Sequence, residues 1–207
     1  MNTLVFILEI LGTVAFAASG AMVGINKKMD IFGVCILGLT VSVGGGVIRD
    51  VILGNTPPNT FQNPVYALVA IGISIIVFIP TVRNLLKKTQ KIYDTTMLIL
   101  DTVGLGVFTV VGVQVAHSVS YETGYFLSIF VGVITGVGGG IMRDLFADDI
   151  PYIFVKHIYA CASLVGALLC TFLWSIIGEA AAMIVGSIAV ITLRFCAAHF
   201  RWSLPRA

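Results

Sequence analysis

Charged residues are scarce in this chain of 207 residues, because Asp, Glu, Lys and Arg together make up only 11% of it. A soluble domain usually has about a quarter of its residues charged. Hydrophobic residues account for 58% of the chain, and the mean hydropathy is +1.04. Apolar runs of about twenty residues, the length that crosses a bilayer, recur from end to end. These features exclude a soluble globular domain and predict an all-α polytopic membrane protein.

Patterns typical of soluble binding sites and active sites are also missing. No basic run interleaved with aromatic residues is present, so nothing supports nucleic-acid binding. The cysteines and histidines lack metal-ligand spacing; they are Cys35, Cys161, Cys170, Cys196, His117, His157 and His199. They indicate neither a disulfide framework nor a zinc site, and the apolar stretches contain no nucleophile–base pair. We therefore expect no enzyme, no metal site and no cofactor.

Short polar or turn-rich links divide the apolar sequence into seven stretches. We predict membrane spans at residues 3–25, 31–53, 64–83, 93–116, 122–147, 153–177 and 179–199. The basic residues of the links follow only the odd-numbered spans; they are Lys27, Lys28, Arg83, Lys87, Lys88, Lys91, Lys156, Arg201 and Arg206. Because basic loops stay in the cytoplasm, this pattern predicts an N-terminus outside and a cytoplasmic C-terminus.

Two motifs occur twice, in the same order and at matched spacing. Glu9-x-x-Gly12-x-x-x-Phe16-x-x-x-Gly20 returns as Asp101-x-x-Gly104-x-x-x-Phe108-x-x-x-Gly112. Gly44-Gly45-Gly46-Val47-Ile48-Arg49-Asp50 returns as Gly138-Gly139-Gly140-Ile141-Met142-Arg143-Asp144. Each copy holds three spans, an odd number, so the second copy must insert upside down. We predict repeat one with a basic linker at 1–91, an inverted repeat two at 92–178, and a seventh helix with a cytoplasmic tail at 179–207.

The glycine triplets lie late in the second and fifth spans. Each glycine in a helix costs about 1 kcal/mol relative to alanine, and a helix break inside a membrane is tolerated only beside protein or a water-filled cavity. We therefore expect both helices to kink or unwind at Gly44–Gly46 and Gly138–Gly140 and to line a solute path near the midplane. Close helix packing is the alternative use of small residues.

The Arg49-Asp50 and Arg143-Asp144 pairs are the costliest residues to place in a bilayer, and such residues mark functional sites. Neighbours on a helix point about 100° apart, so we expect each to find a partner elsewhere: an acid of the other copy, Glu9 or Asp101. Asp101 is a candidate for the solute path. The alternative places both pairs among the lipid headgroups.

An arginine beside a cation path needs a neutralising partner. Carbonyl groups, Ser42, Thr135 and the acids would then face the ion, with Arg49 and Arg143 as struts or gates. Arginines that faced the solute unpaired would instead favour an anionic or zwitterionic substrate.

The doubled glycine-triplet-Arg-Asp motif on three plus three plus one spans resembles the trimeric intracellular cation channel (TRIC) family. It is most similar to the short prokaryotic members, whose domain is also labelled a bacterial glycine-transporter domain. The resemblance extends from Glu9 to about Phe200. It implies a homotrimer in a prokaryotic inner membrane, with a potassium-permeable pore inside each protomer and the second and fifth helices kinked at the triplets. The Lys-Glu-Val segment of the animal members is absent, so phosphoinositide regulation does not carry over.

Two functions remain open on these grounds. The first is a channel for monovalent cations, chiefly potassium. The second is a secondary transporter for glycine or a similar small amino acid, because inverted repeats and broken helices are typical of transporters too. Bound lipid is a further expectation, because Lys87, Lys88 and Lys91 are able to attract anionic headgroups.

Overall fold

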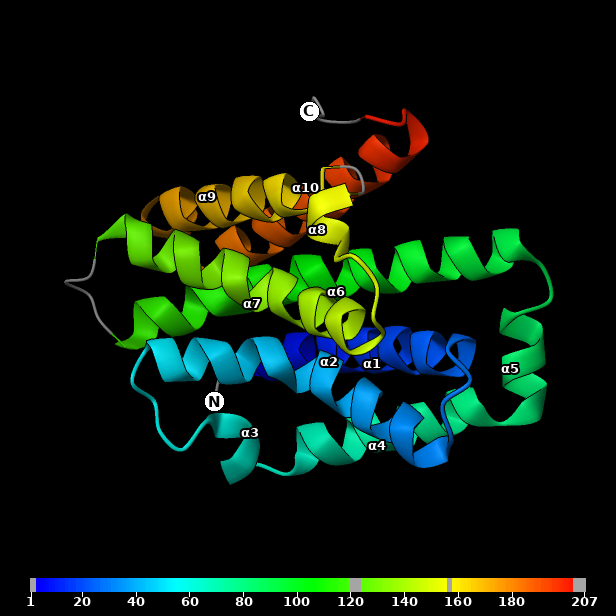
Figure 1. The fold of residues 1–207 in the computed structure, drawn as a ribbon. Coiled ribbons are helices and arrows are strands. Elements are labelled where there is room, and N and C mark those ends of the chain that lie inside the picture. The colour runs from blue at the N-terminus through cyan, green and yellow to red at the C-terminus, as the bar shows by residue number, and fades with distance from the viewer. Residues whose placement is uncertain (1–2, 120–123, 156–157, 203–207) are drawn as a thin grey trace.

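The computed structural model describes residues 3–119, 124–155 and 158–202, and their regular secondary structure is helical (Figure 1). Among these residues, six helices are long and apolar enough to cross a membrane. They are α1 (Thr3–Asn26), α2 (Ile31–Ile52), α6 (Gln90–Val119), α7 (Tyr125–Phe146), α9 (Ala160–Ile177) and α10 (Glu179–His199). The remaining helices are α3 (Asn59–Gln62), α4 (Val65–Phe78), α5 (Pro80–Leu86) and α8 (Tyr152–Val155). The prediction of a polytopic all-helical membrane fold is therefore confirmed.

Two of the seven predicted spans differ from the structure. The predicted span 64–83 is wrong as a single helix, because α4 and α5 are bent by 77° at a short break. Ile79 leaves the helical region, with φ −54° and ψ 131°, and Pro80 begins α5. A proline disfavours helical geometry in the residue before it and suits the first position of a helix, which explains the bend. With each bent pair counted as one span, the number of spans rises to seven.

The predicted span 153–177 begins later than expected. Its first residues belong to the separate short helix α8, and the long helix α9 starts only at Ala160. Lys156, His157 and Arg206, which entered the sequence argument, lie outside the described residues.

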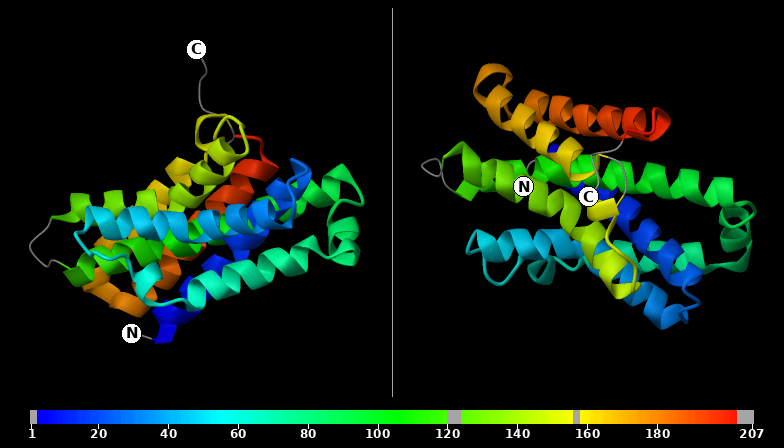
Figure 2. Two further views of the ribbon diagram at one scale, coloured as in Figure 1. Left: turned by 60° about the horizontal axis from the view of Figure 1, so that its bottom comes forward. Right: turned by 45° about the horizontal axis from the view of Figure 1, so that its top comes forward.

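Helices α1 and α6 form the centre of the molecule. Most residues of α1 are buried, as are most residues of α6 between Met97 and Ala116. The two helices lie between α4 on one flank and the pair α9 and α10 on the other (Figures 1 and 2). Phe16 and Phe108, one from each central helix, pack with ring centroids 5.3 Å apart. Helices α2 and α7 pack on this centre and on each other.

The outer surface carries many large apolar side chains. Phe32, Phe126, Phe154 and Ile176 are all more than 70% exposed. A soluble monomer rarely exposes so much apolar surface. A bilayer covers these side chains without cost, so the exposed surface agrees with the lengths of the helices.

The turn between α1 and α2 fixes where α2 starts. The Asp30 carboxylate accepts a hydrogen bond of 2.7 Å from the Gly33 amide and so caps α2. In the same turn, Lys27 Nζ lies 2.6 Å from Asp149 Oδ1 in the loop after α7. This exposed ion pair connects the α1–α2 turn of the first half with the loop after α7 of the second half.

Candidate functional site

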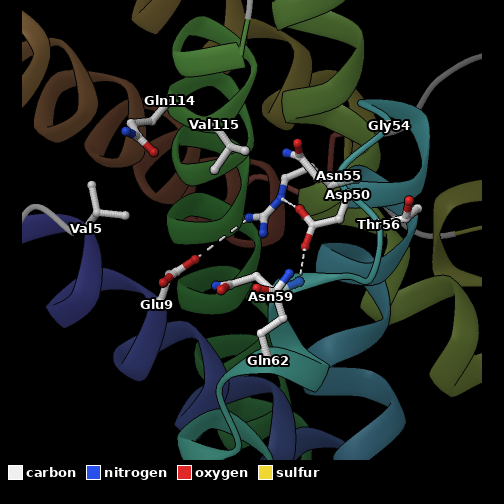
Figure 3. A pocket seen from close by; sticks show the side chains of 11 residues that line it. Val5, Glu9, Asp50, Gly54, Asn55, Thr56, Asn59, Gln62, Gln114 and Val115 are labelled. Carbon is white, nitrogen blue, oxygen red and sulfur yellow. Dashed lines mark hydrogen bonds and ion pairs between the residues drawn. The ribbon is translucent and has the colours of Figure 1, made fainter.

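The first charged cluster joins four helices around Arg49. We call Glu9, Arg49 and Asp50 the Arg49 centre. Arg49 Nε donates to Asp50 Oδ1 at 2.8 Å, and Arg49 Nη1 lies 3.8 Å from Glu9 Oε1 (Figure 3). The Tyr66 hydroxyl of α4 donates to Glu9, and the Asn59 amide donates to Asp50 Oδ2 at 2.9 Å. The arginine is therefore neutralised by two carboxylates, which are in turn held by α3 and α4.

The second cluster repeats this arrangement around Arg143. We call Asp101, Arg143 and Asp144 the Arg143 centre. Arg143 Nε donates to Asp144 Oδ1 at 2.8 Å, and Arg143 Nη1 donates to Asp101 Oδ1 at 2.5 Å. The Tyr152 amide donates to Asp144 Oδ2 at 2.8 Å, as Asn59 does to Asp50. Arg143 Nη1 also donates to the Ser19 hydroxyl at 2.7 Å, which connects this centre to α1.

These contacts settle two expectations about the arginine partners. Pairing of Arg49 with Glu9 and of Arg143 with Asp101 is confirmed. The expectation that an arginine and the aspartate next to it face each other poorly is wrong, because each long side chain curls back so that Nε reaches its neighbour. Each guanidinium therefore has an acid on its own helix and one on a neighbouring helix.

The glycine triplets do not unwind their helices. Both α2 and α7 stay α-helical through Gly44–Gly46 and Gly138–Gly140, so the expectation of unwound backbone is wrong. A side chain at Gly45 would collide with the Thr135 carbonyl oxygen, and one at Gly139 with the Val41 carbonyl oxygen. The middle glycines thus let the two backbones approach closely, and packing keeps the helical hydrogen bonds intact.

The other triplet glycines differ in how much room they have. A side chain at Gly44 would meet the Met142 sulfur, one at Gly138 the Gly45 α-carbon, and one at Gly140 the Tyr159 hydroxyl. Gly46 alone among the six has no atom closer than 3.8 Å to such an added carbon. Gly46 is also the triplet residue that lines a cavity.

Contacts between the two halves are reciprocal. Phe108 packs on Gly12 and Phe16 packs on Gly104, at matching positions of the repeated motif. The same holds for the Gly45–Thr135 and Gly139–Val41 approaches described above. In Figure 1, α1 runs opposite to α6 and α2 runs opposite to α7. Reciprocal contacts of this kind are typical of a two-fold relation between the contacting parts.

A cavity of about 510 Å³ opens at the Arg49 centre, and we call it the large cavity. Figure 3 shows the side chains of the Arg49 centre at this cavity, together with polar residues of the loop after α2, of α3 and of α6. Its lining comprises Val5, Glu9, Arg49, Asp50, Gly54, Asn55, Thr56, Asn59, Gln62, Gln114 and Val115. The cavity is predominantly polar, and its charged groups belong to the Arg49 centre.

A smaller cavity of about 30 Å³ lies beyond the large one and shares Glu9, Arg49 and Asn59 with it. Ser42 and Phe108 also line it. Thr135, the other predicted polar residue, is fully buried and donates to the Val131 carbonyl at 2.7 Å. The structure thus brings Ser42 and Gly46 to the Arg49 centre and places Thr135 in the α2–α7 contact.

Sequence reasoning missed one ionisable residue in the membrane region. Arg194 on α10 is 3% exposed, and its Nη2 lies 3.7 Å from Asp101 Oδ2. Its guanidinium also stacks over the Tyr159 ring, 4.7 Å from the ring centroid. A single arginine within an apolar stretch of 21 residues was the available signal. The residue has no counterpart in the repeat, so the repeat argument passed over it.

The six long apolar helices and the buried ionic centres define a polytopic membrane protein of the all-helical class. A family model described as "Glycine transporter" matches residues 6–81 and 98–175. The inner membrane protein YadS of Escherichia coli is 36% identical over 205 residues, covering 98% of this chain and 95% of YadS. The membrane protein YvgT of Bacillus subtilis is 33% identical over 202 residues, covering 96% of this chain and 94% of YvgT.

Solved structures give the same assignment. The TRIC channel orthologue from Rhodobacter sphaeroides is 33% identical with a TM-score of 0.88, covering 97% of this chain and all of that one. A prokaryotic TRIC channel in 0.5 M KCl is 31% identical with a TM-score of 0.89, covering 99% of this chain and all of that one. The chain belongs to the TRIC family. It is a multi-pass protein of the prokaryotic inner-membrane type.

Proposed function

We propose that this protein is a potassium-permeable cation channel whose pore runs inside each protomer, between the two repeated halves. The observation that carries the proposal is the neutralisation of both buried arginines by carboxylates, with the Arg49 centre open to a polar cavity. A guanidinium paired in this way does not repel a cation, whereas the oxygens around it attract one. The solved relatives are cation channels by description, which favours a channel over an enzyme and over a glycine carrier.

The pore would lie on a pseudo-two-fold axis in the membrane plane. The reciprocal contacts of Phe16 and Phe108, and those of Gly45 and Gly139, support an inverted repeat. The opposite directions of matching helices support it too (Figure 1). Inverted repeats place permeation sites near the midplane, where the halves meet. We propose that α2 and α7 bend at their glycine triplets while remaining helical.

The described conformation corresponds to a closed pore. The small cavity ends against Phe108, which packs on Phe16, and the backbones of α2 and α7 approach closely beyond it. Conduction requires α2 and α7 to separate at this contact. Such a rigid-body shift of packed helices is a common way of opening a path.

We further propose a homotrimer, with the N-terminus outside and the C-terminus in the cytoplasm. The trimer is supported by the likeness to TRIC channels, and the orientation by the basic links. Lys87 and Lys88 lie after α5 and are able to bind anionic lipid headgroups. Lys87 also donates to the Ile25 carbonyl at 3.1 Å.

The test is ion flux through the purified full-length protein in liposomes and planar bilayers. Potassium, sodium, chloride and glycine are compared at equal gradients. We expect unitary potassium currents and no glycine counterflow. Saturable glycine counterflow in vesicles from the same preparation, with silent bilayers, would overturn the proposal.

A further inference from the structure

The two arginine centres differ by one charge, which comes from the helix that lies outside the repeat. The Arg49 centre has two carboxylates and one guanidinium, so its formal charge is −1. The Arg143 centre has the same three groups. Arg194 approaches that centre from α10 and brings a second guanidinium, so the formal charge there is 0. The paired sites of the repeat are therefore electrically unequal.

The contacts of Arg194 direct its charge at Asp101. Its Nη2 lies 3.7 Å from the Asp101 Oδ2 atom, and that oxygen has no hydrogen-bond partner among the described residues. The Tyr159 ring under the guanidinium holds it in place. In the first half, Tyr66 precedes Ala67 as Tyr159 precedes Ala160 in the second, and Tyr66 donates its hydroxyl to Glu9. Asp101 thus has the charged Arg194 beside it, where Glu9 has the neutral hydroxyl of Tyr66.

The two centres also differ in their access to the large cavity. Glu9 and Asp50 line the large cavity, whereas Arg143 is fully buried and Asp101 is 1% exposed. A net negative charge beside a polar cavity concentrates cations, and an electroneutral, buried centre does not. The Arg49 centre is therefore better suited to bind a cation than the Arg143 centre.

We propose that Arg194 determines where a permeating cation binds: by cancelling the charge of Asp101, it confines the cation site to the Arg49 centre. The inference rests on the proposed channel function and assigns a role to the helix outside the repeat. Glu9 and Asp50 then hold the ion at the large cavity, while the Arg143 centre acts as an electroneutral part of the path. Arg194 acts through Asp101 and is a positioning residue.

The test is the potassium concentration that half-saturates the single-channel conductance of the full-length protein. Arg194→Gln removes the charge and should lower this concentration by about tenfold, because Asp101 becomes a second cation site. Arg194→Lys keeps the charge and should behave as wild type. Arg201→Gln, an exposed arginine after the same helix, is the matched control. Neutralising Asp101 together with Arg194, in Asp101→Asn/Arg194→Gln, should abolish the gain.

A reciprocal variant tests the idea without disturbing the Arg143 centre. Gln114 lines the large cavity with Glu9, so Gln114→Arg adds to the first centre the charge that Arg194 brings to the second. It should raise the half-saturating potassium concentration by about tenfold, and Gln114→Met should not. Equal values for Arg194→Gln, Arg201→Gln and wild type, or for Gln114→Arg and Gln114→Met, would overturn the inference. Absence of wild-type currents would instead refute the channel function.

Discussion

The Arg49 centre and the Arg143 centre are built from matching residues, yet the first lines a cavity of about 510 Å³, whereas the arginine of the second is fully buried. In both, an arginine bonds the next aspartate and an acid from a central helix. The difference lies in what surrounds them: a polar loop and a cavity at the first, Arg194 and Tyr159 at the second. Matching arrangements of charges therefore differ in what surrounds them, and substitutions in each centre test whether that difference matters for stability and for conduction.

The largest effect on stability should come from a substitution in the Arg143 centre. Asp101→Asn removes the negative charge that lies 2.5 Å from the fully buried Arg143, and breaking a buried ion pair costs about 3–5 kcal/mol. Glu9→Gln should cost much less, since Glu9 lies 3.8 Å from Arg49 and lines the large cavity. The free energies of unfolding of the two variants in the same detergent test this difference. Equal losses would contradict the contrast between the centres.

The second effect concerns the helix contact between the halves. Gly45→Ala and Gly139→Ala place a methyl group against the Thr135 and Val41 carbonyl oxygens, and overpacking of this kind costs about 1–3 kcal/mol. Gly46→Ala is the matched control, because that position has room. We expect the control to be neutral or slightly stabilising. Thermal unfolding compares the three, and similar melting temperatures for all of them would contradict the close approach of α2 and α7.

The third effect concerns conduction past the Arg49 centre. Glu9→Gln removes the negative charge beside the large cavity, so potassium conductance at low salt should fall by about tenfold. The fall should shrink at high salt, because screening weakens the field of the charge that was removed. Single-channel recording at two ionic strengths measures both. A conductance that is unchanged at low salt would show that Glu9 lies off the path.

The smallest effect should come from the exposed ion pair of Lys27 and Asp149. Lys27 and Asp149 are 34% and 49% exposed, and exposed pairs contribute only about 0.2–1 kcal/mol. A double-mutant cycle with Lys27→Ala and Asp149→Ala measures the coupling. A larger coupling free energy would contradict the small contribution expected of an exposed ion pair.

Much of the fold could be read from periodicity and repeats. Runs of apolar residues located the helices, and the repeat singled out Glu9 and Asp101 as partners of the arginines. The bend at Pro80 was missed, although the proline lay inside the predicted span 64–83, because the hydrophobic run continues through it. Hydropathy records composition along the chain, and it does not show where the chain turns.

The rest depended on tertiary contacts that one sequence does not show. Three consecutive glycines disfavour a helix, which is why the sequence predicted a break. In the structure, the middle glycines pack against backbone carbonyl groups of the facing helix. The curling of Arg49 onto Asp50 follows from the length of the arginine side chain, which an argument from helix angles ignores. Arg194 acts on a residue 93 positions away, and nothing in its local sequence indicates that partner.

The central claim is that cations pass through the large cavity beside the Arg49 centre. The most direct measurement is potassium current through a Gln114→Cys variant, in a background where the four native cysteines are replaced, before and after a bulky, membrane-impermeant thiol reagent. We predict that modification of Cys at this cavity-lining position blocks the current. Complete modification with an unchanged current would contradict the account, since the ion would then pass elsewhere.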